Sequence, residues 1–175
     1  MKAMDEAQLV EIGKGDIMAN MRNYHLNGTA RAIAISTDGG DNFGDIYYDQ
    51  TLVDPICAAS IIRDYKDDML YFSNAAHPTN RIRMTVKRSS DFGKSWEKEL
   101  LVYEGPSAYS DMIDLDSNEY LMIPIKILNN NAKQNIITIS IKVIVIFIFL
   151  FVHMDLENLL YTVHHVYKLV YHQHR

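Results

Sequence analysis

The sequence lacks the features that mark disulfide-rich secreted proteins and nucleic-acid-binding proteins. Its 175 residues include one cysteine, Cys57, which excludes an internal disulfide framework. Lysine and arginine number 17 against 22 aspartates and glutamates, and no basic cluster exists, so nucleic acid is not an expected partner. Residues 1–9 contain acidic side chains and lack the apolar stretch of a signal peptide. We therefore expect either a cytosolic protein or a true start upstream.

Acidic residues are missing altogether from residues 121–154, where the composition changes sharply. We expect two regions, namely residues 1–120 with mixed charge and short apolar runs, and a divergent tail of residues 121–175. Within the tail, residues 136–152 are almost entirely apolar. Residues 155–171 place leucine and valine near helical spacing, which predicts a short amphipathic helix.

Three interpretations of the apolar segment 136–152 stay open. The segment is just short of the roughly 20 residues of a transmembrane helix and Lys142 interrupts it, so a membrane span is the first. A buried or aggregation-prone strand is the second, because isoleucine, valine and phenylalanine favour β structure. Translated non-coding sequence is the third. The histidines that follow have no metal-ligand spacing, so we expect no metal site.

Short segments within residues 1–120 alternate between apolar and polar side chains, as half-buried β-strands do. Examples are residues 31–36 and 83–87, and a tight turn at residues 13–16 separates two further apolar runs. Short strands at near-regular spacing predict an all-β sandwich, barrel or propeller. Periodicity alone does not choose among these three architectures.

One eight-residue pattern, Ser-x-Asp-x-Gly-x-x-aromatic, occurs twice, each time after an alternating strand. Its carboxylate can accept hydrogen bonds from nearby backbone N–H groups, its glycine permits a positive φ, and its aromatic ring anchors the turn. Such a repeat is typical of a blade-by-blade architecture. We assign a structural role to its residues, which are Ser36, Asp38, Gly40 and Phe43 in the first copy and Ser89, Asp91, Gly93 and Trp96 in the second.

These repeats resemble the Asp-boxes of sialidases (exo-α-neuraminidases), which are six-bladed β-propellers. Because Asp-boxes also occur in other propellers, they specify architecture better than activity. The segment from Glu6 to Arg22 resembles the family segment with the catalytic glutamate and the second arginine of the substrate-binding triad. Residues 72–81 resemble the segment with the third arginine, and residues 105–110 the segment with the nucleophilic tyrosine. The motifs follow the family's order over roughly residues 5–118.

The resemblance implies an all-β fold of two to three blades of a six-bladed propeller, since a blade needs on the order of 40 to 50 residues. It implies that Arg22 and Arg81 bind the carboxylate of a sialoside through charge-assisted hydrogen bonds. It also implies that Glu6 takes the phenolic proton as Tyr109 attacks, which gives a covalent intermediate and net retention. No cofactor is implied.

Two of these assignments have rivals nearby. We favour Arg81 over Arg83 because a preceding turn presents Arg81 at the start of a strand. We favour Tyr109 over Tyr103 because Tyr109 follows a Gly-Pro pair in a loop, whereas Tyr103 belongs to a strand-like run.

The family's first triad arginine and its acid/base aspartate lie upstream of the Glu6 motif, and the match fades after Met112. We therefore expect both residues to be absent and turnover to be small. Alternatives are a catalytically inactive fragment that at most binds sialic acid, and an Asp-box propeller for protein interaction. Family resemblance implies sialylated glycoconjugates, gangliosides included, as substrates. It also implies a lysosomal, membrane-associated or cytoplasmic location, with residues 136–152 as the possible membrane contact. It predicts neither linkage preference nor oligomeric state.

Overall fold

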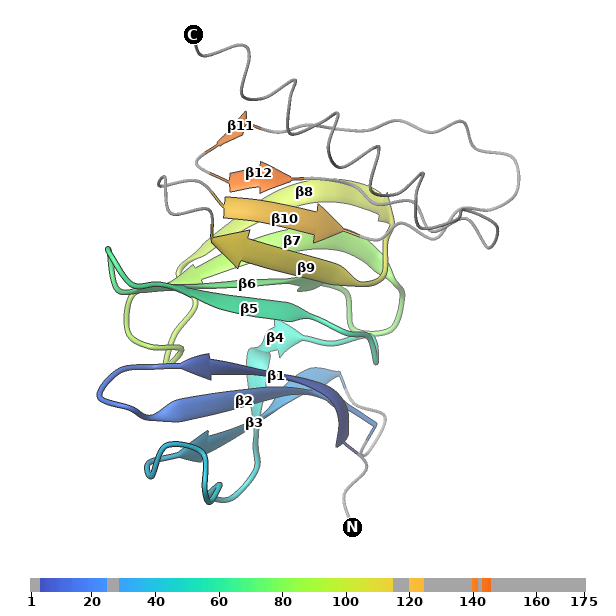
Figure 1. Cartoon of the computed structure of the whole chain (residues 1–175). Helices are drawn as coiled ribbons and strands as arrows, with labels where there is room; N and C mark the ends of the chain where they lie inside the picture. Colours follow the sequence, from blue (N-terminus) through green and yellow to red (C-terminus); the bar gives the residue numbers. More distant parts are fainter. Residues whose placement is uncertain (1–3, 25–28, 115–119, 125–139, 142, 146–175) are drawn as a thin grey trace, which may run out of the picture.

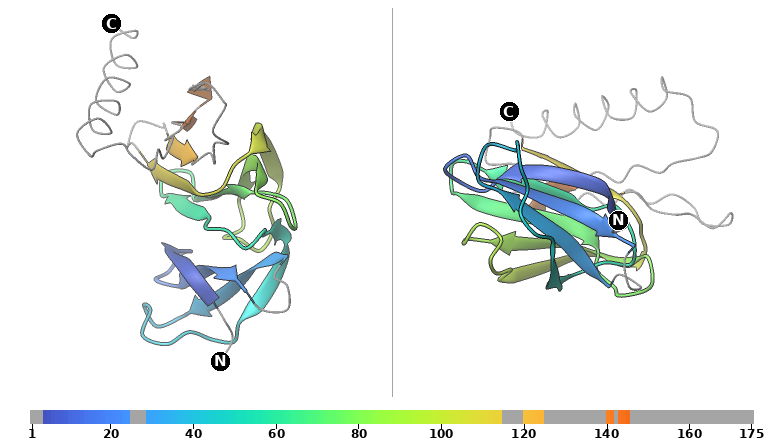
Figure 2. Two further views of the ribbon diagram at one scale, coloured as in Figure 1. Left: turned by 90° about the vertical axis from the view of Figure 1, so that its right-hand side faces the viewer. Right: turned by 90° about the horizontal axis from the view of Figure 1, so that it is seen from below.

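The computed structural model contains three β-sheets that follow one another along the molecule, with the second between the first and the third (Figures 1 and 2). The residues that it describes are 4–24, 29–114, 120–124, 140–141 and 143–145. They form strands, turns and loops without a helix, which confirms the all-β prediction. The amphipathic helix predicted for 155–171 and most of the apolar segment 136–152 lie outside the described residues. No helix in the described part is long and apolar enough to cross a membrane.

The first two sheets are antiparallel meanders of four strands in sequence order. The first holds β1 (Met4–Glu11), β2 (Ile17–Asn23), β3 (Ala30–Ser36) and β4 (Tyr47–Val53). The second holds β5 (Ser60–Asp64), β6 (Met69–Ala75), β7 (Ile82–Ser89) and β8 (Lys98–Pro106). Each therefore has the strand order of a propeller blade.

The third sheet starts like a blade and then departs from it. Its strands are β9 (Ser110–Asp114), β10 (Tyr120–Pro124), β11 (Ser140–Ile141) and β12 (Val143–Val145), in the order β11-β12-β10-β9. β9 and β10 pair antiparallel, whereas β10 and β12 pair parallel. A meander would pair them antiparallel, so this sheet is only partly blade-like.

The first strands of the sheets lie side by side, β1 against β5 and β5 against β9. β1 and β9 begin at the same end of this row (Figure 1). The first residues of β1 and the residues just before β9 are therefore brought together although the whole second sheet separates them in sequence. This end of the row holds the candidate site.

Apolar side chains fill the space between successive sheets. Leu52 from the first sheet and Leu70 and Phe72 from the second are fully buried in one cluster. A second cluster joins the second sheet to the third through Met84, Val102 and Met112. Burying one such side chain contributes about 1.5–3 kcal/mol. The sheets are thus fixed face to face, which fixes the loops at their ends.

The two Asp-box turns have the same hydrogen bonds. In the first, Asp38 Oδ1 accepts from Ser36 Oγ at 2.7 Å and from the backbone N–H of Asn42 at 2.9 Å. In the second, Asp91 Oδ1 accepts from Ser89 Oγ and from the N–H of Ser95, both at 2.8 Å. The pattern's glycines, Gly40 and Gly93, have φ of 102° and 82°, which other residues rarely adopt.

The aromatic residues of the two turns differ in their surroundings. Trp96 packs on Phe72 with 5.7 Å between ring centroids, and its Nε1 donates to Asp49 of the first sheet at 3.1 Å. Phe43 is 40% exposed, so the expected anchoring by the ring does not extend to the first turn. The second turn packs against the preceding sheet, whereas the first extends away from the described sheets (Figure 1).

Candidate functional site

Glu6 lies at a β-bulge in the pairing of β1 with β2. Two residues of β1, Glu6 and Ala7, face the single residue Met21 of β2. Glu6 has a φ of 41°, in the left-handed region that non-glycine residues seldom occupy. Bulges re-aim side chains and are over-represented beside active sites. Here the bulge accompanies a carboxylate that reaches the end of β2.

Three side chains from distant segments form a closed triangle of hydrogen bonds. Arg22 Nη1 donates to Glu6 Oε2 and, at 3.2 Å, to Tyr109 Oη. Tyr109 Oη donates to Glu6 Oε1 at 2.8 Å. Arg22 is the next-to-last residue of β2 and is buried, and Tyr109 immediately precedes β9. We call Glu6, Arg22 and Tyr109 the cluster.

Arg81 lies beside the cluster. Its Cζ is 5.8 Å from the centroid of the Tyr109 ring, and its Nη2 donates to the carbonyl of Ile56 at 2.9 Å. The rival Arg83 instead binds Glu104 at 2.8 Å on the exposed side of the second sheet. The rival Tyr103 packs against the core between the second and third sheets. The four residues selected from the sequence, Glu6, Arg22, Arg81 and Tyr109, thus lie together.

The electrostatics of the cluster keep the carboxyl ionised and the phenol neutral. Partial burial raises the pKa of Glu6, but hydrogen bonds from Arg22 and Tyr109 outweigh burial, and the net pKa is lowered. The hydrogen bond to the Glu6 carboxylate, followed by burial, raises the pKa of Tyr109. At neutral pH the pair is therefore a carboxylate base that holds a protonated hydroxyl, the arrangement a tyrosine nucleophile needs.

A buried ion pair lies beneath this end of the sheets, and neither of its residues was among those predicted from the sequence. Arg31 Nη1 binds Asp54 Oδ2 at 3.1 Å, and the two side chains are 1% and 0% exposed. Arg31 Nε also donates to Asn20 Oδ1 at 2.7 Å. Next to them Cys57 is buried, and burial raises the pKa of its thiol to about 11. A thiol with that pKa stays protonated and is a poor nucleophile.

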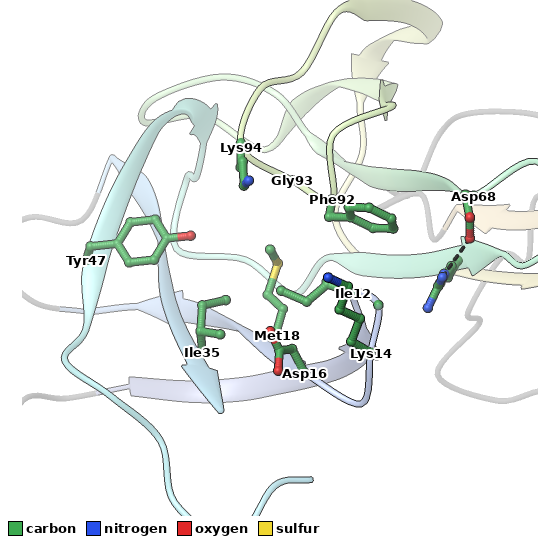
Figure 3. Close-up of a pocket in the computed structure, with 12 residues that line it drawn as sticks. Ile12, Lys14, Asp16, Met18, Ile35, Tyr47, Asp68, Phe92, Gly93 and Lys94 are labelled. Carbon is green, nitrogen blue, oxygen red and sulfur yellow. Dashed lines mark hydrogen bonds and ion pairs between the residues drawn. The ribbon is translucent and has the colours of Figure 1, made fainter. Parts of the chain in front are cut away.

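A cavity of about 680 Å³ lies between the first two sheets at their opposite end (Figure 3). Met18, Tyr47 and the turn residues Phe92 and Lys94 are among those that line it, and no member of the cluster does. Its Arg63 is already paired with Glu11 and Asp68. The cavity therefore lies at the end of the molecule that carries the second Asp-box turn, away from the cluster. The described residues contain no group of histidine, cysteine, aspartate or glutamate that could hold a metal ion.

Known proteins share this architecture. The chain belongs to the BNR repeat-like domain family, whose match covers residues 2–123. It is 36% identical over 125 residues to a sialidase of Micromonospora viridifaciens, covering 67% of this chain and 19% of that protein. It is also 36% identical over 124 residues to a sialidase of Bacteroides fragilis (strain YCH46), covering 64% and 22%.

A solved structure, Hadza microbial sialidase Hz136, matches with a TM-score of 0.56 and 35% identity, over 62% of this chain and 22% of that one. The resemblance to sialidases and the partial propeller are thereby confirmed. The chain spans about a fifth of the length of the curated relatives it matches.

Proposed function

We propose that this chain is the part of a sialidase-type, retaining glycoside hydrolase that carries the nucleophile, its base and two substrate-binding arginines. The hydrogen bond from Tyr109 to Glu6, with Arg22 and Arg81 beside it, is the observation that carries the proposal. Sialylated glycoconjugates are the proposed substrates. Gangliosides as substrates, and a lysosomal or membrane location, stay predictions from family resemblance.

The chemistry of a sialoside explains this set of residues. The anomeric carbon carries a carboxylate, so a carboxylate nucleophile would approach against like-charge repulsion, whereas a neutral hydroxyl does not. As Tyr109 Oη bonds to the anomeric carbon, its proton passes to Glu6 and the glycosidic bond breaks. The leaving oxygen takes a proton from a general acid. Water, deprotonated by that same group, then displaces tyrosine, Tyr109 recovers its proton from Glu6, and the configuration is retained.

The two arginines supply the charge that binds the substrate. Arg22 donates a hydrogen bond to the Tyr109 hydroxyl, and the guanidinium of Arg81 lies near the Tyr109 ring. A planar guanidinium can bind a carboxylate through two parallel hydrogen bonds, which fixes orientation as well as position. We propose that they hold the sialoside carboxylate with its anomeric carbon facing Tyr109.

The first arginine of the family's triad and its acid/base aspartate have no motif in this sequence. We propose that they belong to the remainder of a whole sialidase, and that residues 1–120 are its propeller portion with residues 121–175 as a divergent tail. The end of the family match at residue 123 supports this division. General acid assistance contributes about 10²–10⁴ in rate, so we expect the chain as printed to turn over little or not at all.

The first test is release of 4-methylumbelliferone from its α-sialoside, with Tyr109→Phe as control, and sialic acid binding measured on the same folded sample. Turnover that Tyr109→Phe abolishes would show a working site and contradict the expected inactivity. Binding without turnover is the expected result, because the two arginines would hold the ligand while the acid/base aspartate has no motif in this sequence. A folded sample with neither would overturn the proposed function for this chain.

A further inference from the structure

The turn between β4 and β5 contains an unusual backbone conformation at Ile56. Its φ is 55°, in the left-handed region. For a β-branched side chain this is a genuine outlier. Residues in such conformations cost about 1–3 kcal/mol and persist only where the surroundings hold them.

The buried ion pair holds the turn from beneath. Asp54 Oδ1 accepts the backbone N–H of Cys57 at 2.9 Å, which closes the turn around Ile56. Arg31 Nη1 donates to the carbonyl of Cys57 at 2.8 Å as well as to Asp54. Asp54 Oδ2 also accepts the N–H of Asn23 at 3.2 Å, next to Arg22. Both ends of the turn, and the end of β2, are therefore tied to one carboxylate that is fully buried.

The strained residue presents its carbonyl to Arg81. Arg81 Nη2 donates to Ile56 O at 2.9 Å, and Arg81 forms no ion pair within the described ranges. A neutral carbonyl orients a guanidinium without cancelling its charge, whereas a carboxylate partner would compete with an anionic ligand. The carbonyl of Arg81 in turn accepts the N–H of Ser107 at 2.9 Å, two residues before Tyr109. The turn thus contacts Arg81 directly and, through Arg81, is linked to the segment that carries Tyr109.

We propose that Ile56 is a positioning residue for Arg81: its left-handed backbone aims a carbonyl that orients the guanidinium and leaves its charge available to a ligand carboxylate. The Arg31–Asp54 pair holds Ile56 in that conformation. The binding of a ligand carboxylate by Arg81 rests on the proposed function, whereas the orientation of Arg81 by Ile56 does not.

Two substitutions at Ile56 separate conformation from side-chain packing. Ile56→Gly frees the turn, and Ile56→Asn keeps it, because asparagine tolerates the left-handed region. Lys14→Gly is the matched control, since Lys14 has a φ of 57° in the β1–β2 turn at the opposite end. Each variant is made in the full chain. The readouts are the heteronuclear NOE of the Arg81 Nε–Hε signal and the affinity for 2,3-didehydro-2-deoxy-N-acetylneuraminic acid.

We expect Ile56→Gly to lower the Arg81 NOE and to weaken the probe about tenfold, as loss of one oriented hydrogen-bonding group does. Ile56→Asn and Lys14→Gly should match the parent chain. An unchanged Arg81 NOE in Ile56→Gly, or an equal loss in Ile56→Asn, would overturn the inference. If the parent chain does not bind the probe, the proposed function fails, while the NOE still decides the role of Ile56.

Discussion

Tyr109 and Glu6, 103 residues apart in the sequence, share a hydrogen bond of 2.8 Å from Oη to Oε1. The carboxylate favours the protonated phenol, which raises the pKa of Tyr109. A tyrosine with a raised pKa has almost no phenolate at neutral pH and reacts only as its proton departs. In the proposed mechanism, the same contact keeps Tyr109 protonated until it attacks and supplies the base that accepts its proton.

Glu6→Gln should lower the pKa of Tyr109, because the substitution removes the negative charge and leaves the guanidinium of Arg22 in place. The measurement is a titration of tyrosine ring ¹³Cζ signals by NMR, with Tyr109→Phe to assign the signal among 11 tyrosines. Glu104→Gln removes an exposed carboxylate that binds Arg83 and should leave Tyr109 unchanged. An unaltered or higher Tyr109 pKa in Glu6→Gln would contradict the assigned pairing.

The first Asp-box should contribute to stability in a pH-dependent way. The backbone N–H of Asn42, with the side chains of Ser36 and Asn42, lowers the pKa of Asp38 from 3.8 to about 2. Because the folded pKa is depressed, this stabilisation is fully present above about pH 4 and is lost as pH falls through about 2. Asp38→Asn should lower the urea midpoint at neutral pH and reduce its decline on acidification.

The control for this prediction is Asp41→Asn, an exposed carboxylate in the same loop. It should leave both the neutral midpoint and the acid decline close to those of the parent chain. A parallel decline in Asp38→Asn and the parent would show that the Asp38 hydrogen bonds add no stability.

The sequence was sufficient for the features that are local. An Asp-box is a contiguous turn with a fixed hydrogen-bond pattern, and its second copy follows an alternating strand in the same way as its first. The sheet order follows from short connections between successive strands. Predicting that Glu6, Arg22 and Tyr109 meet required the resemblance to a family. No local pattern shows which residues come together when the whole second sheet separates them in sequence.

Residues that depend on distant partners escaped prediction. Arg31 lies in an alternating strand, where a charged residue suggests a solvated face, yet it is fully buried. Asp54 and Asn20, from other strands and turns, supply the charge and hydrogen bonds that make this burial possible. The left-handed backbone of Ile56 could not be predicted for a related reason. A β-branched residue disfavours this conformation, and distant residues impose it.

The Arg31–Asp54 pair should be costly to break. Arg31→Met leaves the Asp54 carboxylate buried without its cation, so we expect the free energy of unfolding to fall by about 3–5 kcal/mol. Arg83→Met is the matched control, because it removes an exposed ion pair with Glu104, worth about 0–1 kcal/mol. Chemical denaturation measures both. The double variant Arg31→Met/Asp54→Asn should lose less than the sum of the single losses, and strict additivity would argue against coupling.

The glycines of the two Asp-boxes should differ in their tolerance of alanine. Gly40 has no heavy atom within 4 Å of where a Cβ would lie, so Gly40→Ala should cost only the positive-φ penalty, about 1 kcal/mol. At Gly93 the Cβ would lie 2.6 Å from Met18 Cε and 3.4 Å from Leu70 Cδ1. Met18 is 2% exposed within the core between the sheets, so it has little room to yield. Gly93→Ala should therefore cost about 1–3 kcal/mol more than Gly40→Ala in denaturant unfolding. Equal losses would mean that the Asp-box turn is not packed against the preceding sheet, the contact that distinguishes the second turn from the first.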